Sequence, residues 1–158
     1  MNVKIIVYSY TGNTLEVAKK LQEALKMESI PTTLDEIKTT TEKEMDWKKV
    51  NLSKAPLPDA DCIVFAGPVQ AFNLVTIMRA YLNKMPELNK QPCFFLTTEF
   101  FPFNWMGGNQ AKKAASSIIT AKNGKMVDTG IIHWKSKNRD QAIDLLVNNW
   151  TQKIKGFS

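Results

Sequence analysis

The sequence predicts an α/β protein built as a three-layer sandwich, with one five-stranded parallel sheet between two layers of helices. Two observations carry this prediction. Apolar runs rich in β-branched and aromatic residues alternate five times with segments whose apolar residues recur every three or four positions. The run Asp61–Ala66 is also apolar after its first residue, as expected of a central strand covered on both faces. A length of 158 residues suits a single domain, which we expect to span residues 1–158.

The expected elements follow one another without a repeat or a linker. Predicted strands are the run that begins at Val3, then Thr32–Ile37, Asp61–Ala66, Cys93–Thr97 and Met126–Trp134. Predicted helices are marked by apolar stripes that begin at Val17, Leu74, Ala111 and Ile143, with a short helix also expected around Glu42–Lys49. Right-handed crossovers leave few topologies for such a chain, and of these we expect the strand order 2-1-3-4-5.

The first strand runs into a hydroxyl-rich loop and then directly into a helix. The loop contains Ser9, Thr11, Gly12, Asn13 and Thr14. Unpaired N–H groups and the positive end of the helix dipole make such a helix terminus a natural anion site. A Walker-type loop would add a lysine, and a dinucleotide fingerprint would add two more glycines, so this loop would hold a phosphate with neutral donors only. The same residues are ordinary helix caps, and from this stretch alone both interpretations stay open.

Two further loops are expected beside this one. In the order 2-1-3-4-5, ligands bind beyond the carboxyl ends of strands 1 and 3. The loops that meet there are Ser9–Thr14, Gly67–Phe72 and Thr97–Asn109, and all three have unusual compositions. Their coincidence at one edge of the sheet predicts a binding site.

The third loop is dense in aromatic residues: Phe100, Phe101, Phe103 and Trp105. Loops normally face solvent, so this much aromatic surface needs a partner. The side chains either fold back as a small satellite core, or they contact a ligand or another protein. His133 and Trp134 end the fifth strand at the same edge, and we expect His133 to be a surface residue without a catalytic role.

The charge of the chain is unevenly distributed. The net charge is +6, but residues 1–61 contain nine Lys or Arg against ten Asp or Glu, whereas residues 62–158 contain twelve against five. This asymmetry predicts an anionic partner or substrate for the second part. The cations are scattered and accompany no nucleic-acid-binding motif, so we expect no nucleic acid.

Two cysteines, Cys62 and Cys93, each lie at the start of an apolar run and are expected to be buried free thiols. No apolar segment is long enough to span a bilayer, and nothing at the amino terminus is typical of a signal peptide. We therefore expect a cytoplasmic protein without stable membrane insertion. No metal site and no catalytic residue is identified.

The motif Ser9-Tyr10-Thr11-Gly12-Asn13-Thr14 resembles the phosphate loop of the flavodoxin-like family, Ser/Thr-x-Thr-Gly-Asn-Thr. Gly67-Pro68-Val69-Gln70-Ala71-Phe72 is similar to the second loop of that family and of related quinone reductases, with Gln70 where many relatives have an aromatic residue. Thr97-Thr98 and Gly107-Gly108 fit its third loop, whose Phe-rich centre here is a departure. The resemblance spans nearly the whole chain, which looks like a short-chain form.

This resemblance implies FMN as the cofactor. The implied cofactor-binding residues are Ser9, Thr11, Gly12, Asn13, Thr14, Pro68, Val69, Gln70, Ala71, Phe72, Thr97, Thr98, Glu99, Phe103, Trp105, Gly107 and Gly108. Because Gln70 cannot stack on the flavin, Phe72 or an aromatic residue of the third loop would supply that contact. Two other kinds of protein with this strand order are disfavoured. The chain lacks the acidic pair of a phospho-receiver domain, and it lacks the Asp-x-His-x-x-Gly loop of a cobalamin-binding module.

Two classes of function remain. The first is electron transfer by an FMN-binding protein that docks an anionic redox partner, and the second is an NAD(P)H-dependent FMN oxidoreductase acting on quinones or similar acceptors. A third possibility is that the chain has this fold but binds no flavin and acts as an interaction domain. The positive charge predicts a reduction potential above that of acidic flavodoxins.

Overall fold

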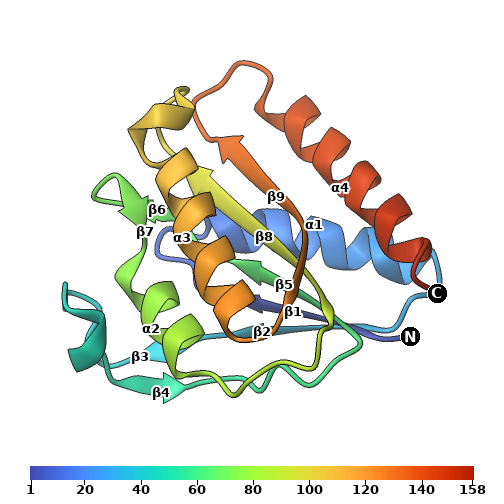
Figure 1. Cartoon of the computed structure of the whole chain (residues 1–158). Coiled ribbons are helices and arrows are strands. Elements are labelled where there is room, and N and C mark those ends of the chain that lie inside the picture. Colours follow the sequence, from blue (N-terminus) through green and yellow to red (C-terminus); the bar gives the residue numbers. More distant parts are fainter.

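Five parallel strands form the central sheet of the computed structural model, which describes residues 1–158 (Figure 1). Their order across the sheet is β2-β1-β5-β8-β9. The strands are β1 (Val3–Val7), β2 (Thr32–Glu36), β5 (Cys62–Ala66), β8 (Pro92–Glu99) and β9 (Lys125–His133). Taken in chain order, these five strands have the arrangement 2-1-3-4-5, which confirms the predicted topology.

Helices cover both faces of the sheet and make the predicted three layers (Figure 1). One face carries α1 (Asn13–Met27) and α4 (Arg139–Lys155), which contact each other. The other face carries α2 (Thr76–Lys84) and α3 (Gly108–Ala121), which also contact each other. Each helix turns its apolar stripe toward the sheet, as its periodicity predicts.

The segment 38–54 differs from the prediction. In place of a helix around Glu42–Lys49, the chain forms a two-stranded antiparallel ribbon, β3 (Lys38–Thr39) with β4 (Leu52–Lys54), and only the short 3₁₀ helix η1 (Trp47–Lys49). The physical reason is local hydrogen bonding. The hydroxyl of Thr39 donates to the carbonyl of Asn51 at 2.7 Å, and the hydroxyl of Thr41 accepts from the Asn51 N–H at 2.9 Å. Such side chain–backbone bonds compete with helix formation.

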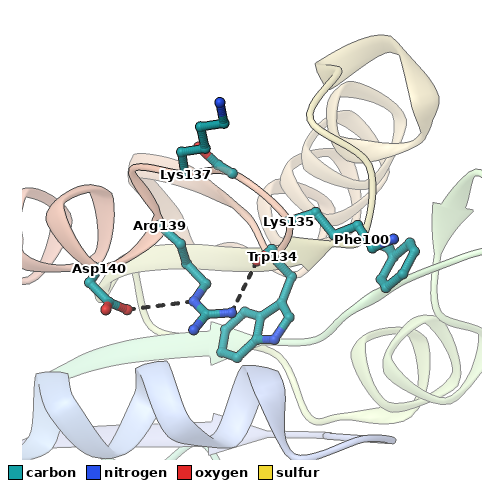
Figure 2. A pocket seen from close by; sticks show the side chains of 7 residues that line it. Phe100, Trp134, Lys135, Lys137, Arg139 and Asp140 are labelled. Carbon is teal, nitrogen blue, oxygen red and sulfur yellow. Dashed lines mark hydrogen bonds and ion pairs between the residues drawn. The ribbon is translucent and has the colours of Figure 1, made fainter.

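The loops at the carboxyl ends of the strands lie at one edge of the molecule (Figure 1). After β5 the chain forms a small hairpin, β6 (Val69–Gln70) with β7 (Asn73–Leu74), which was not predicted. After β8 comes the aromatic loop with the 3₁₀ helix η2 (Asn104–Met106). Residues 134–138 join β9 to α4, and Figure 2 shows the side chains of Trp134, Lys135 and Lys137 from this turn.

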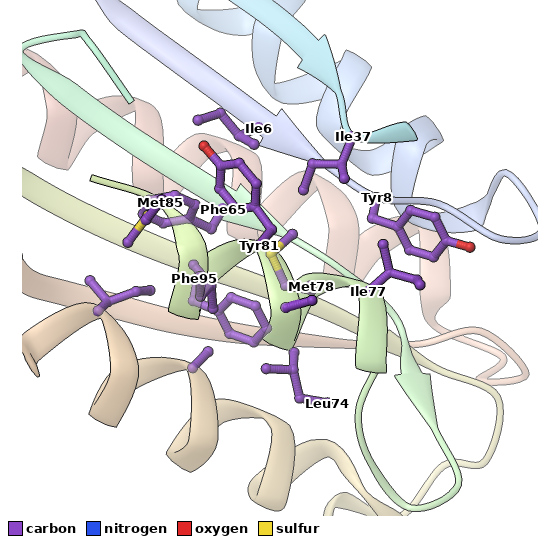
Figure 3. Packing of buried hydrophobic residues seen from close by; sticks show 14 of the residues in the cluster. Ile6, Tyr8, Ile37, Phe65, Leu74, Ile77, Met78, Tyr81, Met85 and Phe95 are labelled. Atoms are coloured by element: carbon purple, nitrogen blue, oxygen red, sulfur yellow. The ribbon is translucent and has the colours of Figure 1, made fainter. Parts of the chain in front are cut away.

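The core has two halves, one on each face of the sheet. Alternate strand residues point to opposite faces, so Ile6, Phe65 and Phe95 pack under α2 and α3 (Figure 3). Phe94 packs on the other side, against Trp150 of α4, with ring centroids 5.0 Å apart. These large buried side chains fix the sheet between the helices and so hold the strand ends in place.

Cys62 and Cys93 are free and fully buried, which confirms the expectation for both. Burial, the largest cause, raises the pKa of each thiol to about 12. None of the helices has the length and the apolar character needed to cross a membrane.

Candidate functional site

A cavity of about 290 Å³ lies at the carboxyl ends of the central strands, where the three predicted loops meet. Its volume is at the lower end of the range for small-molecule sites. The walls are mostly apolar, with a few hydroxyl, amide and carboxyl groups among them. The lining residues are Tyr10, Thr11, Asn13, Pro68, Val69, Gln70, Val75, Thr98, Glu99, Phe100 and Trp134.

The first loop is shaped by Gly12. This residue has a φ of +92°, which L side chains rarely adopt, and α1 begins directly after it. The hydroxyl oxygen of Ser9 accepts hydrogen bonds from the N–H of Gly12 at 3.0 Å and of Leu15 at 3.3 Å. Apart from Gly12 itself and its two neighbours in the chain, no protein atom lies within 4 Å of the position that a Cβ on Gly12 would take. The backbone at the start of α1 therefore faces open space, in which an anion can approach it.

A buried hydrogen bond connects the first loop to the end of β8. The hydroxyls of Thr14 and Thr98 are 2.7 Å apart, and both residues are buried. They are 84 positions apart in the sequence. This contact fixes the start of α1 relative to the third loop, and so sets the width of the cavity between them.

The second loop packs closely on the third at Gly107. A Cβ on Gly107 would lie 2.4 Å from Cγ1 of Val69 and 3.0 Å from the backbone of Phe72, and its φ is +127°. The opposing hairpin turn is itself unusual, since both of its central residues, Ala71 and Phe72, have positive φ, at 49° and 60°. Positive φ at both positions is the pattern of a type I′ turn, which normally uses Asn or Gly.

The third loop holds a buried acid, Glu99, which ends β8. Its Oε2 accepts a hydrogen bond from the N–H of Gly108 at 2.7 Å. Its Oε1 lies 2.9 Å from Nδ1 of His133 but makes no hydrogen bond, because that nitrogen is directed at the carbonyl oxygen of Phe101, 3.0 Å away. Burial, the largest effect, raises the pKa of Glu99, and the Gly108 N–H and His133 partly oppose it.

His133 therefore departs from the expectation of an ordinary surface residue. Its side chain is 22% exposed and takes part in the polar contacts behind the cavity. The reason lies in strand register, since Glu99 and His133 are paired neighbours on β8 and β9. Sequence reasoning placed His133 at the correct edge but could not show which residue faces it.

The aromatic residues of the third loop do not form a satellite core. All four residues are 45–67% exposed. Phe100 packs edge-on against Phe101, and Phe103 stacks on Trp105 with centroids 5.6 Å apart. Of the four, only Phe100 lines the cavity. The loop thus presents apolar surface around the site, where a ligand or a partner can cover it.

Comparison with solved structures identifies the fold. A flavodoxin from Streptococcus pneumoniae matches with a TM-score of 0.66 at 14% identity, over 97% of this chain and 99% of that one. A WrbA-like flavodoxin from Agrobacterium tumefaciens matches with a TM-score of 0.68 at 15% identity, over 99% of both chains. The chain has the flavodoxin-like fold. A flavoprotein from Lactobacillus acidophilus, solved in complex with FMN, also matches, with a TM-score of 0.64 at 15% identity over 91% of this chain and 97% of that one.

These likenesses rest on structure alone. Neither a protein-family model nor a curated protein sequence matches the chain. At such low identities, the agreement with solved flavodoxin-like proteins concerns the path of the backbone, and the side chains of the site have to be assessed on their own chemistry.

Within the flavodoxin-like fold, the residues of the predicted site fall into two groups. Those that line the cavity are Thr11, Asn13, Pro68, Val69, Gln70, Thr98 and Glu99. Those that do not line it are Ser9, Gly12, Thr14, Ala71, Phe72, Thr97, Phe103, Trp105, Gly107 and Gly108. Gln70 has a local role, because its side-chain oxygen is 3.4 Å from the N–H of Thr76, near the start of α2.

Four further residues line the cavity that the sequence-based prediction did not include: Tyr10, Val75, Phe100 and Trp134. Three of them had a signal in the sequence. Tyr10 is part of the first motif, Trp134 was expected at the end of the fifth strand, where ligands bind in this fold, and Phe100 belongs to the aromatic loop that we expected either to pack on itself or to contact a ligand or partner. Val75 has no such signal, since its placement depends on how the second loop packs.

Proposed function

We propose that residues 1–158 form a single domain that binds FMN and transfers electrons to or from a redox partner. The observation that carries this proposal is the meeting of three loops around one cavity at the switch point of a flavodoxin-like sheet, with an uncharged hydroxyl-rich loop opening α1. When bound, FMN supplies one- and two-electron redox chemistry, and the chain positions and shields it.

The 5′-phosphate would lie against the first loop. The N–H groups of Asn13 and Thr14, in the first turn of α1, have no acceptor within the helix, and together with the hydroxyl of Thr11 they could donate to the phosphate. The hydroxyl of Ser9 already accepts two backbone bonds, so its own proton is available to the phosphate. Asn13 adds an amide donor beside the cavity. Thr14 has a supporting part, because its hydroxyl is engaged with Thr98.

The ring of the cofactor would fill the cavity between the second and third loops. Pro68 and Val69 offer an apolar wall, and Thr98 offers a polar one. The buried Oε1 of Glu99 makes no hydrogen bond and lies 2.9 Å from Nδ1 of His133. A ring N–H that reached this oxygen would satisfy it. In this proposal Phe72, Phe103 and Trp105 lie at the rim of the cavity. Thr97, Gly107 and Gly108 hold the loops around the cavity in place.

The redox partner in this proposal is anionic. The excess of Lys and Arg after residue 61 would attract acidic surfaces or phosphorylated molecules and would also favour a reduced, negatively charged cofactor. We therefore expect a reduction potential above that of acidic flavodoxins, which a redox titration of the loaded protein measures. A potential equal to or below theirs would contradict this part of the proposal.

A second candidate function is an NAD(P)H-dependent FMN oxidoreductase acting on quinones or similar acceptors. The exposed rings of Tyr10 and Phe100 at the cavity favour it, since a planar acceptor could stack against them. Steady-state NAD(P)H oxidation with a quinone separates the two candidates. Turnover supports the enzyme, and its absence in a protein that still exchanges electrons with a protein carrier supports the first candidate.

The decisive experiment is a titration of the cofactor-free protein with FMN and with riboflavin, followed by flavin absorbance and fluorescence. Because riboflavin lacks the phosphate, we expect FMN to bind at least 100-fold more tightly. In the double variant S9A/T11V this preference should fall by tenfold or more, while riboflavin affinity changes little. The matched control is Thr33→Val on β2, where an exposed hydroxyl is lost far from the loop. Equal affinity for the two flavins, or no binding of either, would overturn the proposal.

A further inference from the structure

A second hollow, of about 430 Å³, adjoins the first cavity and is strongly basic (Figure 2). The turn between β9 and α4 forms most of it, through residues 134–137 and Arg139–Asp140. Phe100 closes the other side. Phe100 and Trp134 line both cavities, so the two spaces share a wall of two aromatic side chains.

Two of the three cations in this hollow are held in place by that shared wall. The ammonium of Lys135 lies 4.4 Å from the ring centroid of Phe100. The guanidinium of Arg139 lies 4.4 Å from the ring centroid of Trp134, and its Nη1 donates a hydrogen bond to the Trp134 carbonyl at 3.1 Å (Figure 2). Cation–π contacts of this kind orient long side chains that would otherwise sample many rotamers. The third cation, Lys137, is exposed on the same turn.

The charge of the hollow is only partly neutralised. Asp140 is the one acidic lining residue, 3.5 Å from Nε of Arg139, and its side chain is 80% exposed. Three cations against one carboxylate leave a net charge of +2. A phosphate ester carries close to two negative charges at neutral pH, whereas a carboxylate carries one. The hollow also borders the first residues of α4, a helix of 17 residues whose dipole adds positive potential there.

We propose that this hollow is a binding site for the phosphate group of a small phosphate ester, whose remainder reaches the mouth of the neighbouring cavity across Phe100 and Trp134. The guanidinium of Arg139 keeps N–H groups on Nη1 and Nη2 for two phosphate oxygens, and the lysines raise the positive potential of the hollow. The inference depends on the proposed function only where it places a flavin in the neighbouring cavity. Phosphate binding in the hollow does not depend on it.

The test is a titration of ¹⁵N-labelled, FMN-saturated protein with inorganic pyrophosphate, followed by amide and indole NMR shifts. FMN occupies the first loop, so that loop cannot report the added anion. Acetate, at the same ionic strength, probes whether a carboxylate suffices. The variant K135Q/K137Q removes two charges from the hollow, and K19Q/K113Q removes two exposed charges from α1 and α3 as a matched control. Arg139→Lys keeps the charge but removes the guanidinium.

We expect saturable pyrophosphate shifts at residues 134–140, including the Trp134 indole, and much weaker shifts with acetate. Affinity should fall at least tenfold in K135Q/K137Q, less than threefold in K19Q/K113Q, and by an intermediate factor in Arg139→Lys. Shifts spread over all exposed lysines, equal losses in the two double variants, or acetate binding as tight as pyrophosphate would overturn the inference.

Failure of the proposed function gives a different result. If the chain does not bind FMN, the same titration is made on the unloaded protein. Saturable shifts at residues 134–140 would then still support the phosphate site in the hollow. Shifts confined to residues 9–15 would overturn the inference.

Discussion

The carboxylate of Glu99 and the imidazole of His133 lie 2.9 Å apart at paired positions on neighbouring parallel strands. This contact stands behind the proposed flavin cavity and joins β8, β9 and the start of α3, since Glu99 also accepts from the Gly108 N–H. It connects three segments that are distant in the sequence. The pH dependence of stability should reveal it.

We expect the free energy of unfolding of Glu99→Gln to increase relative to that of the wild type as the pH rises from 4.5 to 8. The native pKa of Glu99 is raised above its unfolded value, chiefly by burial, so its stabilising contribution is complete below the unfolded pKa and is lost as pH rises through the native pKa. Glutamine has no such loss. Denaturant unfolding at several pH values measures the difference, and parallel pH profiles would contradict the prediction.

Two variants control this experiment. In the His133→Gln background the pH effect of Glu99→Gln should grow, because His133 lowers the pKa of Glu99. For Asp128→Asn, the pH dependence of the stability difference from the wild type should have the opposite sign. Burial would raise the pKa of Asp128, but hydrogen bonds from Lys153, Thr129 and Trp150 outweigh it and lower that pKa. Its stabilisation is therefore present above the unfolded pKa and lost as pH falls through the native one.

The hydrogen bond between Thr14 and Thr98 should be measurable as a coupling energy. Replacing either residue by valine leaves the other hydroxyl buried without its partner, which costs about 1–3 kcal/mol. The double variant leaves no orphan hydroxyl, so its loss should be smaller than the sum of the two single losses by about 1 kcal/mol. Denaturant unfolding of all four proteins completes the cycle. Strictly additive losses would show that the two hydroxyls do not interact.

Gly107 and Gly12 should respond differently to alanine. Gly107→Ala combines a φ of +127° with a contact of 2.4 Å to Val69, and we expect it to destabilise the fold by about 3 kcal/mol or more. Gly12→Ala meets only the backbone strain, about 1–2 kcal/mol, because the space beside it is open.

Unfolding midpoints of these two variants and of G107A/V69A measure the difference. Truncating Val69 should restore part of the loss in Gly107→Ala, since the backbone of Phe72 still lies 3.0 Å from the new Cβ. A larger loss for Gly12→Ala than for Gly107→Ala in the cofactor-free protein would contradict this account.

The turn Ala71-Phe72 stores backbone strain that glycine should relieve. Phe72 has a φ of 60° and an exposed side chain, so Phe72→Gly removes strain worth about 1 kcal/mol and buries no new surface. We expect a higher unfolding midpoint for this variant. Phe101→Gly, which removes another exposed aromatic of the rim without a positive φ, is the control and should not stabilise. A lower midpoint for Phe72→Gly would show that its ring contributes more to stability than the strain costs.

Strand boundaries show how much of the fold the local sequence can predict. The alternation of apolar runs with helical stripes predicted five strands in their correct order, but the fourth strand was expected to end at Thr97, whereas β8 continues to Glu99. The extension exists because Thr98 and Glu99 pair with Ile132 and His133 of β9. Pairing energy of this kind comes from a strand more than thirty residues away, and no local pattern contains it.

The sequence by itself determined the layered fold, the neutral loop at the start of α1 and the edge of the sheet at which three unusual loops meet, because hydrophobic periodicity and turn chemistry act over a few residues. Only the tertiary structure decided that Glu99 is buried beside His133, that Thr14 contacts Thr98, and that the aromatic rings of the third loop stay exposed. These features depend on register and on contacts between segments that only the packed sheet brings together.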